Sequence, residues 1–304
     1  MRICSTMPGA TEILFSLGLG DEVTGVSFEC DYPEAAKRKP LLVTSVVDYR
    51  HIRSDQIDRL VLDFLRRGQS LYQVDLEVLR EAQPDLIVTQ DLCDICAVTV
   101  SDVRSAIQEL TKPPRLVGLH PHSLDDLLQG IQQVGQATQR EQAASQLVGE
   151  LRMRIDMVRS KTGQVTARPR VVCLEWLKPL MAAGHWVPEM VEAAGGEAGL
   201  TKAAQPAVYV TWEQVRAYQP EVLLLMPCGF SVSRALQEVE LVTQLEGWLT
   251  LPAVRNRRVF VLDGSAYFNR PGPRLVTGLE ILGTLLHPEL APWPPLPDGA
   301  VKPL

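Results

Sequence analysis

A long stretch without any strand pattern, residues 123–162, separates two regions in which strands and helices alternate. Its sequence, SLDDLLQGIQQVGQATQREQAASQLVGELRMRIDMVRSKT, predicts one helix and then a longer one that ends at Gly163. Before it, apolar runs such as RICS, EVTGVS and DLIVT alternate with amphipathic segments, and the alternation resumes at VVCLEW. Strands and helices at this spacing predict parallel βαβ units. We therefore expect an α/β protein of two lobes joined by a single long helix.

The expected domain boundaries follow from this pattern. They are 1–122 for an N-terminal α/β lobe, 123–163 for the helical segment with the inter-lobe helix, 164–287 for a C-terminal α/β lobe, and 288–304 for a proline-rich tail. A weak internal repeat supports two lobes of similar build: LEVLREAQPDLIVT (76–89) and WEQVRAYQPEVLLL (212–225) each predict a short helix, a Gln-Pro break and a strand. In the first lobe, residues 54–67 predict an amphipathic helix with Ser54 as its N-cap.

Composition excludes some classes of partner. The 304 residues carry a net charge of −6, which does not indicate the basic surface that nucleic-acid binding requires. At the N-terminus, Pro8, Thr11 and Glu12 interrupt the apolar run that a signal peptide requires, so the chain as written is expected to be cytoplasmic. If the true start lies upstream, a periplasmic or surface-anchored location is the alternative. Six cysteines in a chain of this length do not predict a disulfide scaffold.

The loops that follow the predicted strands are rich in aromatic residues and cysteines. Ligands of parallel sheets bind beyond the carboxyl ends of the strands, so the corresponding loops of two facing lobes would line one shared cleft. Each aromatic residue taken singly is consistent with core packing. Taken together, aromatic residues on both halves favour a cleft for a large, flat, partly apolar ligand, with Trp176 a stronger candidate than Trp186.

The stretch RICSTMPGATEILFSLGLGDEVTGVSFECDYP resembles the N-terminal signature of periplasmic substrate-binding proteins for vitamin B12, iron-siderophores and haem, and is most similar to the cobalamin-binding branch. The resemblance spans residues 2–287 and includes the QPD entry to a strand and the FNRPGPR start of the last helix. It implies two Rossmann-like lobes joined by one rigid helix, and non-catalytic binding of cobalamin or a related corrinoid between them. No cofactor is required, cobalamin or another tetrapyrrole being the ligand itself. Haem or an iron-siderophore is the alternative ligand.

The resemblance also implies ligand contacts. It places them at Pro8, Gly9, Ala10 and Glu29 in the first lobe and at Trp176, Tyr267 and Phe268 in the second. Other residues of the strand-end loops complete the candidate ligand-binding set: Cys30, Asp91, Cys93, His185, Trp186, Cys228, Gly229 and Arg270. The implied partner is the membrane subunit of an ABC importer. The glutamates that dock such a subunit are not evident, since Asn269 and Asp102 stand in the matching regions.

The cysteines and one histidine leave further alternatives open. Cys93, Cys96, Cys228 and His185 could together hold a metal ion, or His185 alone could ligate the metal of a bound tetrapyrrole, whereas reduced, unpaired thiols are the simpler interpretation. A Cys/His metal-binding or redox protein therefore remains an alternative. An enzyme with Cys228 as nucleophile and His185 as base is also conceivable. The sequence contains no G-x-G-x-x-G, Walker A, H-E-x-x-H or G-x-S-x-G motif, which favours a binding protein.

Overall fold

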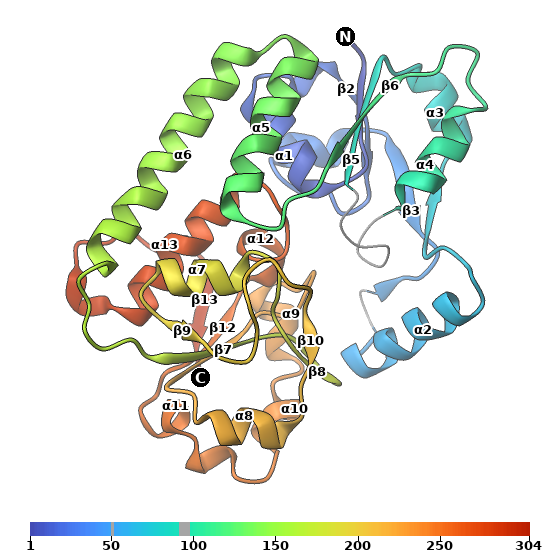
Figure 1. The fold of residues 1–304 in the computed structure, drawn as a ribbon. Helices are drawn as coiled ribbons and strands as arrows, with labels where there is room; N and C mark the ends of the chain where they lie inside the picture. The colour runs from blue at the N-terminus through green and yellow to red at the C-terminus, as the bar shows by residue number, and fades with distance from the viewer. Residues whose placement is uncertain (50–51, 91–97) are drawn as a thin grey trace.

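The computed structural model describes residues 1–49, 52–90 and 98–304. Two α/β lobes, each built around its own sheet, are joined by a long helix that runs along one side of the molecule (Figure 1). The predicted fold class is confirmed. Within the described ranges, no helix is both long and apolar enough to cross a bilayer.

The N-terminal lobe contains a sheet of strand order β4-β3-β2-β1-β5-β6, parallel except where β4 pairs with β3. Its strands are β1 (Ile3–Ser5), β2 (Val23–Ser27), β3 (Leu41–Ser45), β4 (Tyr72–Val74), β5 (Leu86–Gln90) and β6 (Arg115–Leu119). Its helices are α1 (Pro8–Ser16), α2 (Ser54–Arg66), α3 (Leu76–Ala82) and α4 (Val100–Ile107), with 3₁₀ turns at Gly20–Glu22 and Glu34–Arg38. The strand and helix pattern of the sequence is confirmed here, apart from β4, which it did not predict.

The C-terminal lobe contains a sheet of order β10-β8-β7-β11-β12-β13, with β9 beside the start of β7. Its strands are β7 (Arg170–Leu177), β8 (Leu180–Ala182), β9 (Glu197–Ala198), β10 (Val208–Tyr209), β11 (Val222–Leu225), β12 (Val259–Leu262) and β13 (Val301–Pro303). Its helices are α7 (Val187–Ala193), α8 (Trp212–Tyr218), α9 (Val232–Leu236), α10 (Glu240–Thr243), α11 (Pro252–Arg255), α12 (Gly264–Tyr267) and α13 (Arg274–Leu286), with 3₁₀ turns at Trp248–Thr250 and Pro288–Leu290. The tail is more than a surface wrapping, because β13 pairs antiparallel with β12.

The internal repeat corresponds to a repeated structure. Helices α3 and α8 both end at a glutamine in the left-handed conformation, Gln83 (φ 41°) and Gln219 (φ 53°), and a proline follows each. Strands β5 and β11 then enter their sheets beside β1 and β7, the first strand of each lobe. The two Gln-Pro breaks therefore place equivalent strands in the two lobes.

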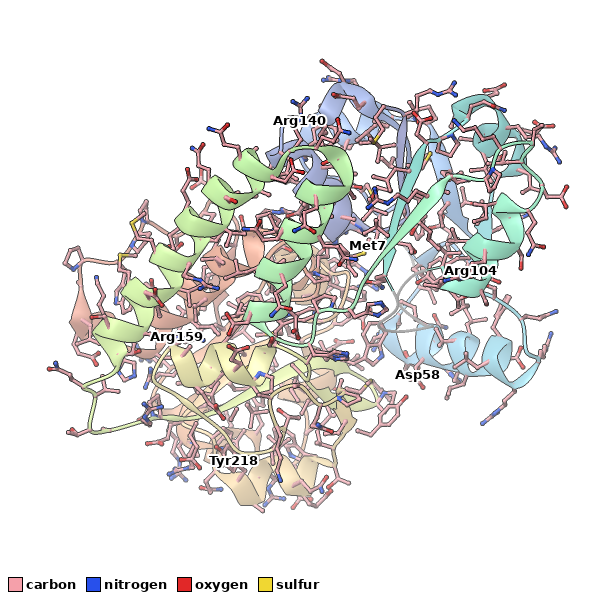
Figure 2. All side chains as sticks on the ribbon, turned by 45° about the horizontal axis from the view of Figure 1, so that its top comes forward. Met7, Asp58, Arg104, Arg140, Arg159 and Tyr218 are labelled. Atoms are coloured by element: carbon pink, nitrogen blue, oxygen red, sulfur yellow. The ribbon has the colours of Figure 1, made fainter. Side chains whose placement is uncertain are left out.

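The helices α5 (Leu124–Thr138) and α6 (Glu141–Thr162) form the bridge between the lobes. At the upper end of α6, Arg140 pairs with Glu22 of the N-lobe at 3.3 Å. At its lower end, Arg159 pairs with Glu189 at the start of α7 at 3.0 Å, and Figure 2 shows these two arginines at opposite ends of the helix. Between them, Arg154 donates two hydrogen bonds to the buried Glu280 of α13, at 2.9 and 2.6 Å. Contacts along its whole length hold the bridge to both lobes.

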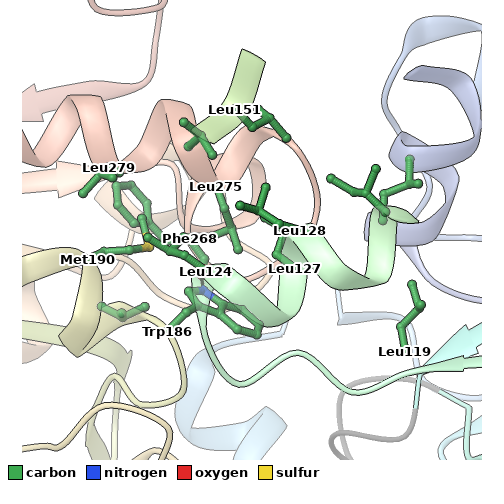
Figure 3. Close-up of a cluster of buried hydrophobic side chains, with 14 of the residues drawn as sticks. Leu119, Leu124, Leu127, Leu128, Leu151, Trp186, Met190, Phe268, Leu275 and Leu279 are labelled. Atoms are coloured by element: carbon green, nitrogen blue, oxygen red, sulfur yellow. Dashed lines mark hydrogen bonds between the residues drawn. The ribbon is translucent and has the colours of Figure 1, made fainter. Parts of the chain in front are cut away.

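One hydrophobic core is continuous across the two lobes. Leu124, Leu127 and Leu128 of α5 pack with Leu275 and other residues of α13, so the bridge shares its interior with the C-lobe (Figure 3). The same cluster extends to the strands of the N-lobe sheet. Because close-packed interiors resist deformation, this shared core predicts a lobe junction with little freedom to bend.

Candidate ligand site between the lobes

At the lobe junction, the start of α1 meets the turn before α13. A Cβ added to Gly9 would lie 2.4 Å from the carbonyl oxygen of Pro271, so only glycine permits this approach. Gly272 in turn lies against Gly9 and the carboxylate of Glu12. Pro8 and Gly9, two of the expected ligand contacts, are thus buried where the opposite lobe covers them.

Ion pairs cross the same junction. Arg274, at the start of α13, pairs with the buried Glu12 of α1 at 2.6 Å and lies 3.9 Å from Asp31. Arg270 pairs with Asp31 at 2.5 Å. Removing one partner of such a pair leaves a charge without compensation, so these contacts fix how the two lobes meet.

Glu29, another expected contact, lies beside this cluster and is half-buried. Burial raises the pKa of the Glu29 carboxyl, against the opposing attraction of Arg270. A carboxyl with a raised pKa can be held protonated, and a protonated carboxyl can donate a hydrogen bond to a neutral ligand oxygen.

Aromatic side chains of both lobes surround Arg274. Its guanidinium lies 4.1 Å from the ring centroid of Tyr32, in the N-lobe, and 5.9 Å from that of Tyr267, in the C-lobe. Tyr32 is 48 % exposed and Tyr267 is half-buried, so each presents part of its ring to solvent. Tyr267 was predicted from the sequence, but Tyr32 was not, although it stands in the same loop as Glu29.

A second aromatic group lies at the carboxyl ends of β7 and β11. The half-buried Trp176 packs against Phe230 at a centroid distance of 5.5 Å, and the guanidinium of Arg234 lies 4.3 Å from the Phe230 centroid. The amide of Cys228 donates to the carbonyl of Glu175, which places the partly exposed Cys228 next to Trp176. Gly229 has a φ of 75° and open space in front of it. Trp176, Cys228 and Gly229 are thus neighbours.

Helix α2 lies next to this second group. The Trp176 indole donates to the carbonyl of Ser54 at 3.2 Å. Another face of the helix borders an open surface region lined by Ile52, Gln56, Arg59, Leu60 and Asp63. The prediction that Ser54 is the N-cap of α2 is wrong, because the helix begins at Ser54 and its hydroxyl is buried without a partner.

Four predicted ligand contacts are core residues instead. Phe268 has no exposed surface, and Trp186, at 3 % exposure, donates its indole N–H to the Phe268 carbonyl at 2.7 Å (Figure 3). Ala10 is fully buried within α1, and Cys30 is buried beside the Thr11 hydroxyl. The prediction that they face a ligand is wrong because they lie on the inward side of their loops, which the sequence pattern does not reveal.

His185 and Trp176 are not on one wall. After β7 the chain turns back as β8, with Leu174 opposite Ala182, so His185 emerges at the other end of this hairpin from Trp176. There its ring lies 6.0 Å from that of His122 and 5.6 Å from that of Trp186. Burial, and then the neighbouring His122, lower the pKa of His185. The Cys228–His185 pair that catalysis would require is therefore not assembled.

The remaining predicted residues divide into two groups. Asp91, Cys93 and Cys96 lie outside the described residues. Arg270, a predicted ligand contact, lies at the lobe junction, where it pairs with Asp31. Within 1–49, 52–90 and 98–304, no three His, Cys, Asp or Glu side chains are grouped as metal ligands, and the cysteines found free are Cys4, Cys30, Cys173 and Cys228.

Known proteins resemble this chain over nearly its whole length. It is 26% identical over 280 residues to a vitamin B12-binding protein of Vibrio parahaemolyticus, which covers 91% of this chain and 86% of that protein. A solved heme-binding protein of Roseiflexus sp. RS-1 superposes with a TM-score of 0.71 at 25% identity, covering 95% of this chain and 99% of that one. The solved vitamin B12-binding protein of Vibrio cholerae, at 22% identity and a TM-score of 0.67, covers 94% and 96% and shares the fold.

A family model described as "Periplasmic binding protein" matches residues 3–266. The matched range begins at β1 and ends within α12, so it includes every strand of the two sheets except β13, together with the bridging helix α6. The chain is a member of the periplasmic binding protein family.

Proposed function

We propose that the chain binds cobalamin or a related corrinoid in the cleft between its lobes, without catalysis and without a resident cofactor. The observation that carries this proposal is that partly exposed aromatic rings from both lobes, Tyr32 and Tyr267, lie near the same Arg274 guanidinium at a junction that ion pairs hold together. Aromatic faces of this kind suit a large, flat, partly apolar ligand. The extended similarity to the vitamin B12-binding protein of Vibrio parahaemolyticus supports a corrinoid.

Haem is the second candidate ligand. The likeness to the heme-binding protein of Roseiflexus sp. RS-1 favours it, and a planar tetrapyrrole would use the same aromatic surfaces. An iron-siderophore needs less aromatic surface, because it is neither flat nor largely apolar, and therefore ranks below both.

The partner of such a protein would be the membrane subunit of an ABC importer. A relative in Bacillus subtilis, 23% identical over 299 residues, is described as an ABC transporter substrate-binding lipoprotein, which supports this partner and the periplasmic or surface-anchored location over the cytoplasmic one. Docking would use acids other than those in the two regions considered from the sequence. Asp102 accepts a hydrogen bond from Ser70 at 3.1 Å, and the backbone N–H of Asn269 donates to the Gly264 carbonyl at 2.9 Å.

The test is incubation of the full chain with cyanocobalamin, haem or a ferric siderophore, followed by gel filtration with visible-light detection. The proposal predicts that corrinoid absorbance co-elutes with the protein in stoichiometric amount. Co-elution of haem alone would replace the corrinoid by the second candidate. Retention of none of the three, together with stoichiometric zinc or iron by elemental analysis, would contradict both and favour a Cys/His metal protein.

A further inference from the structure

Helix α2 follows the N-lobe strands in sequence, yet its first half packs on the C-lobe. Ile57, 6 % exposed, belongs to the hydrophobic cluster of the C-lobe. Phe64, two turns later, packs against the cluster of the N-lobe, and Val61 between them contacts both. The helix therefore reaches from one lobe to the other, and Figure 1 shows it beside the β8 and β10 edge of the C-lobe sheet.

The N-terminus of α2 lacks a side-chain cap from the residue that precedes it. The first amides of a helix have no partner within it and normally bond to the side chain of the preceding residue. That residue is Arg53, whose side chain has no acceptor. Both carboxylate oxygens of Glu238 accept from the Ser54 amide instead, at 3.1 and 3.0 Å. Glu238 belongs to the C-lobe and is 1 % exposed, so the opposite lobe supplies the cap.

A half-buried arginine extends this contact. Arg234, one turn before Glu238, donates to the Glu238 carboxylate at 2.5 Å and to the Ile52 carbonyl at 2.6 Å. We call the four residues Ile52, Ser54, Arg234 and Glu238 the latch. Charge-assisted hydrogen bonds shielded from water are stronger than exposed ones, so the latch is the main polar attachment of α2 to the C-lobe.

The latch is in contact with a proposed ligand residue. Arg234 lies over Phe230, Phe230 packs against Trp176, and the Trp176 indole donates to Ser54, the residue whose amide Glu238 caps. A ligand that contacts Trp176 would therefore act on the same contacts that hold α2 in place.

We infer that α2 is a lid, anchored to the N-lobe through Phe64 and closed by the latch, and that the cleft opens by release of this helix. The rest of the junction is held by the shared core and by the pairs of Arg270 and Arg274, so opening does not require the lobes to separate. The latch is a property of the ligand-free chain. Only the further step, that corrinoid bound at Trp176 keeps the lid closed, rests on the proposed function.

Two variants weaken the latch from opposite sides. Glu238→Gln keeps an acceptor oxygen but takes away the negative charge that faces both the Ser54 amide and Arg234. Ser54→Pro takes away the donor while keeping the helix, because proline is favoured at the first helical position and Arg53 already has the extended conformation (ψ 154°) that precedes proline. Glu240→Gln is the matched control, since Glu240 is an exposed acid of the same region whose pair with Arg53 contributes little.

The experiment is hydrogen–deuterium exchange of the full ligand-free chain, read by mass spectrometry for α2 and for β11 and β12. Loss of one charge-assisted bond predicts exchange in α2 about 10-fold faster or more in Glu238→Gln and in Ser54→Pro, with β11, β12 and the control unchanged. The double variant should exchange more slowly than strict additivity of the two single effects predicts, because both variants act on the Ser54–Glu238 bond, although Glu238→Gln also weakens the contact with Arg234. If Glu238→Gln does not fold, Ser54→Pro alone decides.

Unchanged exchange of α2 in both variants would overturn the lid, as would strictly additive effects in the double variant. Acceleration of β11 and β12 to the same extent as α2 would overturn it too, because that marks general loosening of the C-lobe. In wild type, cyanocobalamin should slow α2 exchange selectively. A failure to bind cyanocobalamin contradicts the proposed function, while the ligand-free comparison still decides the lid.

Discussion

Gly9 and Pro271 touch across the lobe junction, with the Pro271 carbonyl occupying the place where a side chain at position 9 would begin. Gly9→Ala should therefore force the lobes apart locally and lower the free energy of unfolding by about 1–3 kcal/mol, the usual cost of overpacking. Urea unfolding followed by circular dichroism measures this loss.

Gly149→Ala is the control for that substitution. Gly149 lies in α6 with open space around it, so alanine should raise stability by about 0.5–1 kcal/mol through helix propensity. Equal stability of Gly9→Ala and wild type would show that the junction is looser than described.

Glu29 predicts a pH dependence of stability. Burial raises the folded-state pKa of Glu29 above the ordinary 4.5, so the folded state binds the proton more tightly than the unfolded state does. The contribution of this carboxyl to stability therefore falls as the pH rises from 4.5 to the folded-state pKa. Glu29→Gln mimics the protonated form and should melt higher than wild type at pH 7, with the difference vanishing below about pH 4.5. Thermal melts at several pH values test this, and a variant less stable at pH 7 would contradict it.

The lowered pKa of His185 predicts the opposite pH dependence of stability. Its folded-state pKa lies below the ordinary 6.5, so protonation favours unfolding and wild type should lose this share of stability as pH falls through 6.5. His185→Asn should weaken that loss, and asparagine tolerates the left-handed backbone (φ 53°) of the position. The spectrum of a bound tetrapyrrole should not change, because His185 lies away from Trp176. A shifted spectrum would instead identify His185 as an axial ligand.

Trp176 predicts an effect on affinity. Trp176→Ala should weaken corrinoid binding about 10- to 100-fold, the range of a buried aromatic anchor. Trp293→Ala serves as control, because Trp293 packs in the tail against α13 and should affect stability without affecting affinity. Equal affinity losses in the two variants would remove Trp176 from the site.

The sequence predicted the two lobes because their signals are local. The Gln-Pro breaks after α3 and α8 and the strand-free stretch of α5 and α6 depend on residues close together in the chain. It did not predict the β7–β8 hairpin, since Leu180–Ala182 is too short to show alternation, and that hairpin separates His185 from Trp176.

The candidate site was only partly predictable for a related reason. Whether an aromatic residue of a loop faces inward, as Phe268 does, or outward, as Tyr32 does, depends on packing against distant elements. The cap of α2 could not be foreseen either, because Glu238 lies in the other lobe.

The most direct test of the corrinoid proposal is a calorimetric titration of the full chain with cyanocobalamin. The account predicts saturable binding of one corrinoid per chain in wild type, weakened in Trp176→Ala and preserved in Trp293→Ala. An absence of binding heat in wild type, confirmed by failure of cyanocobalamin to co-elute, would contradict it.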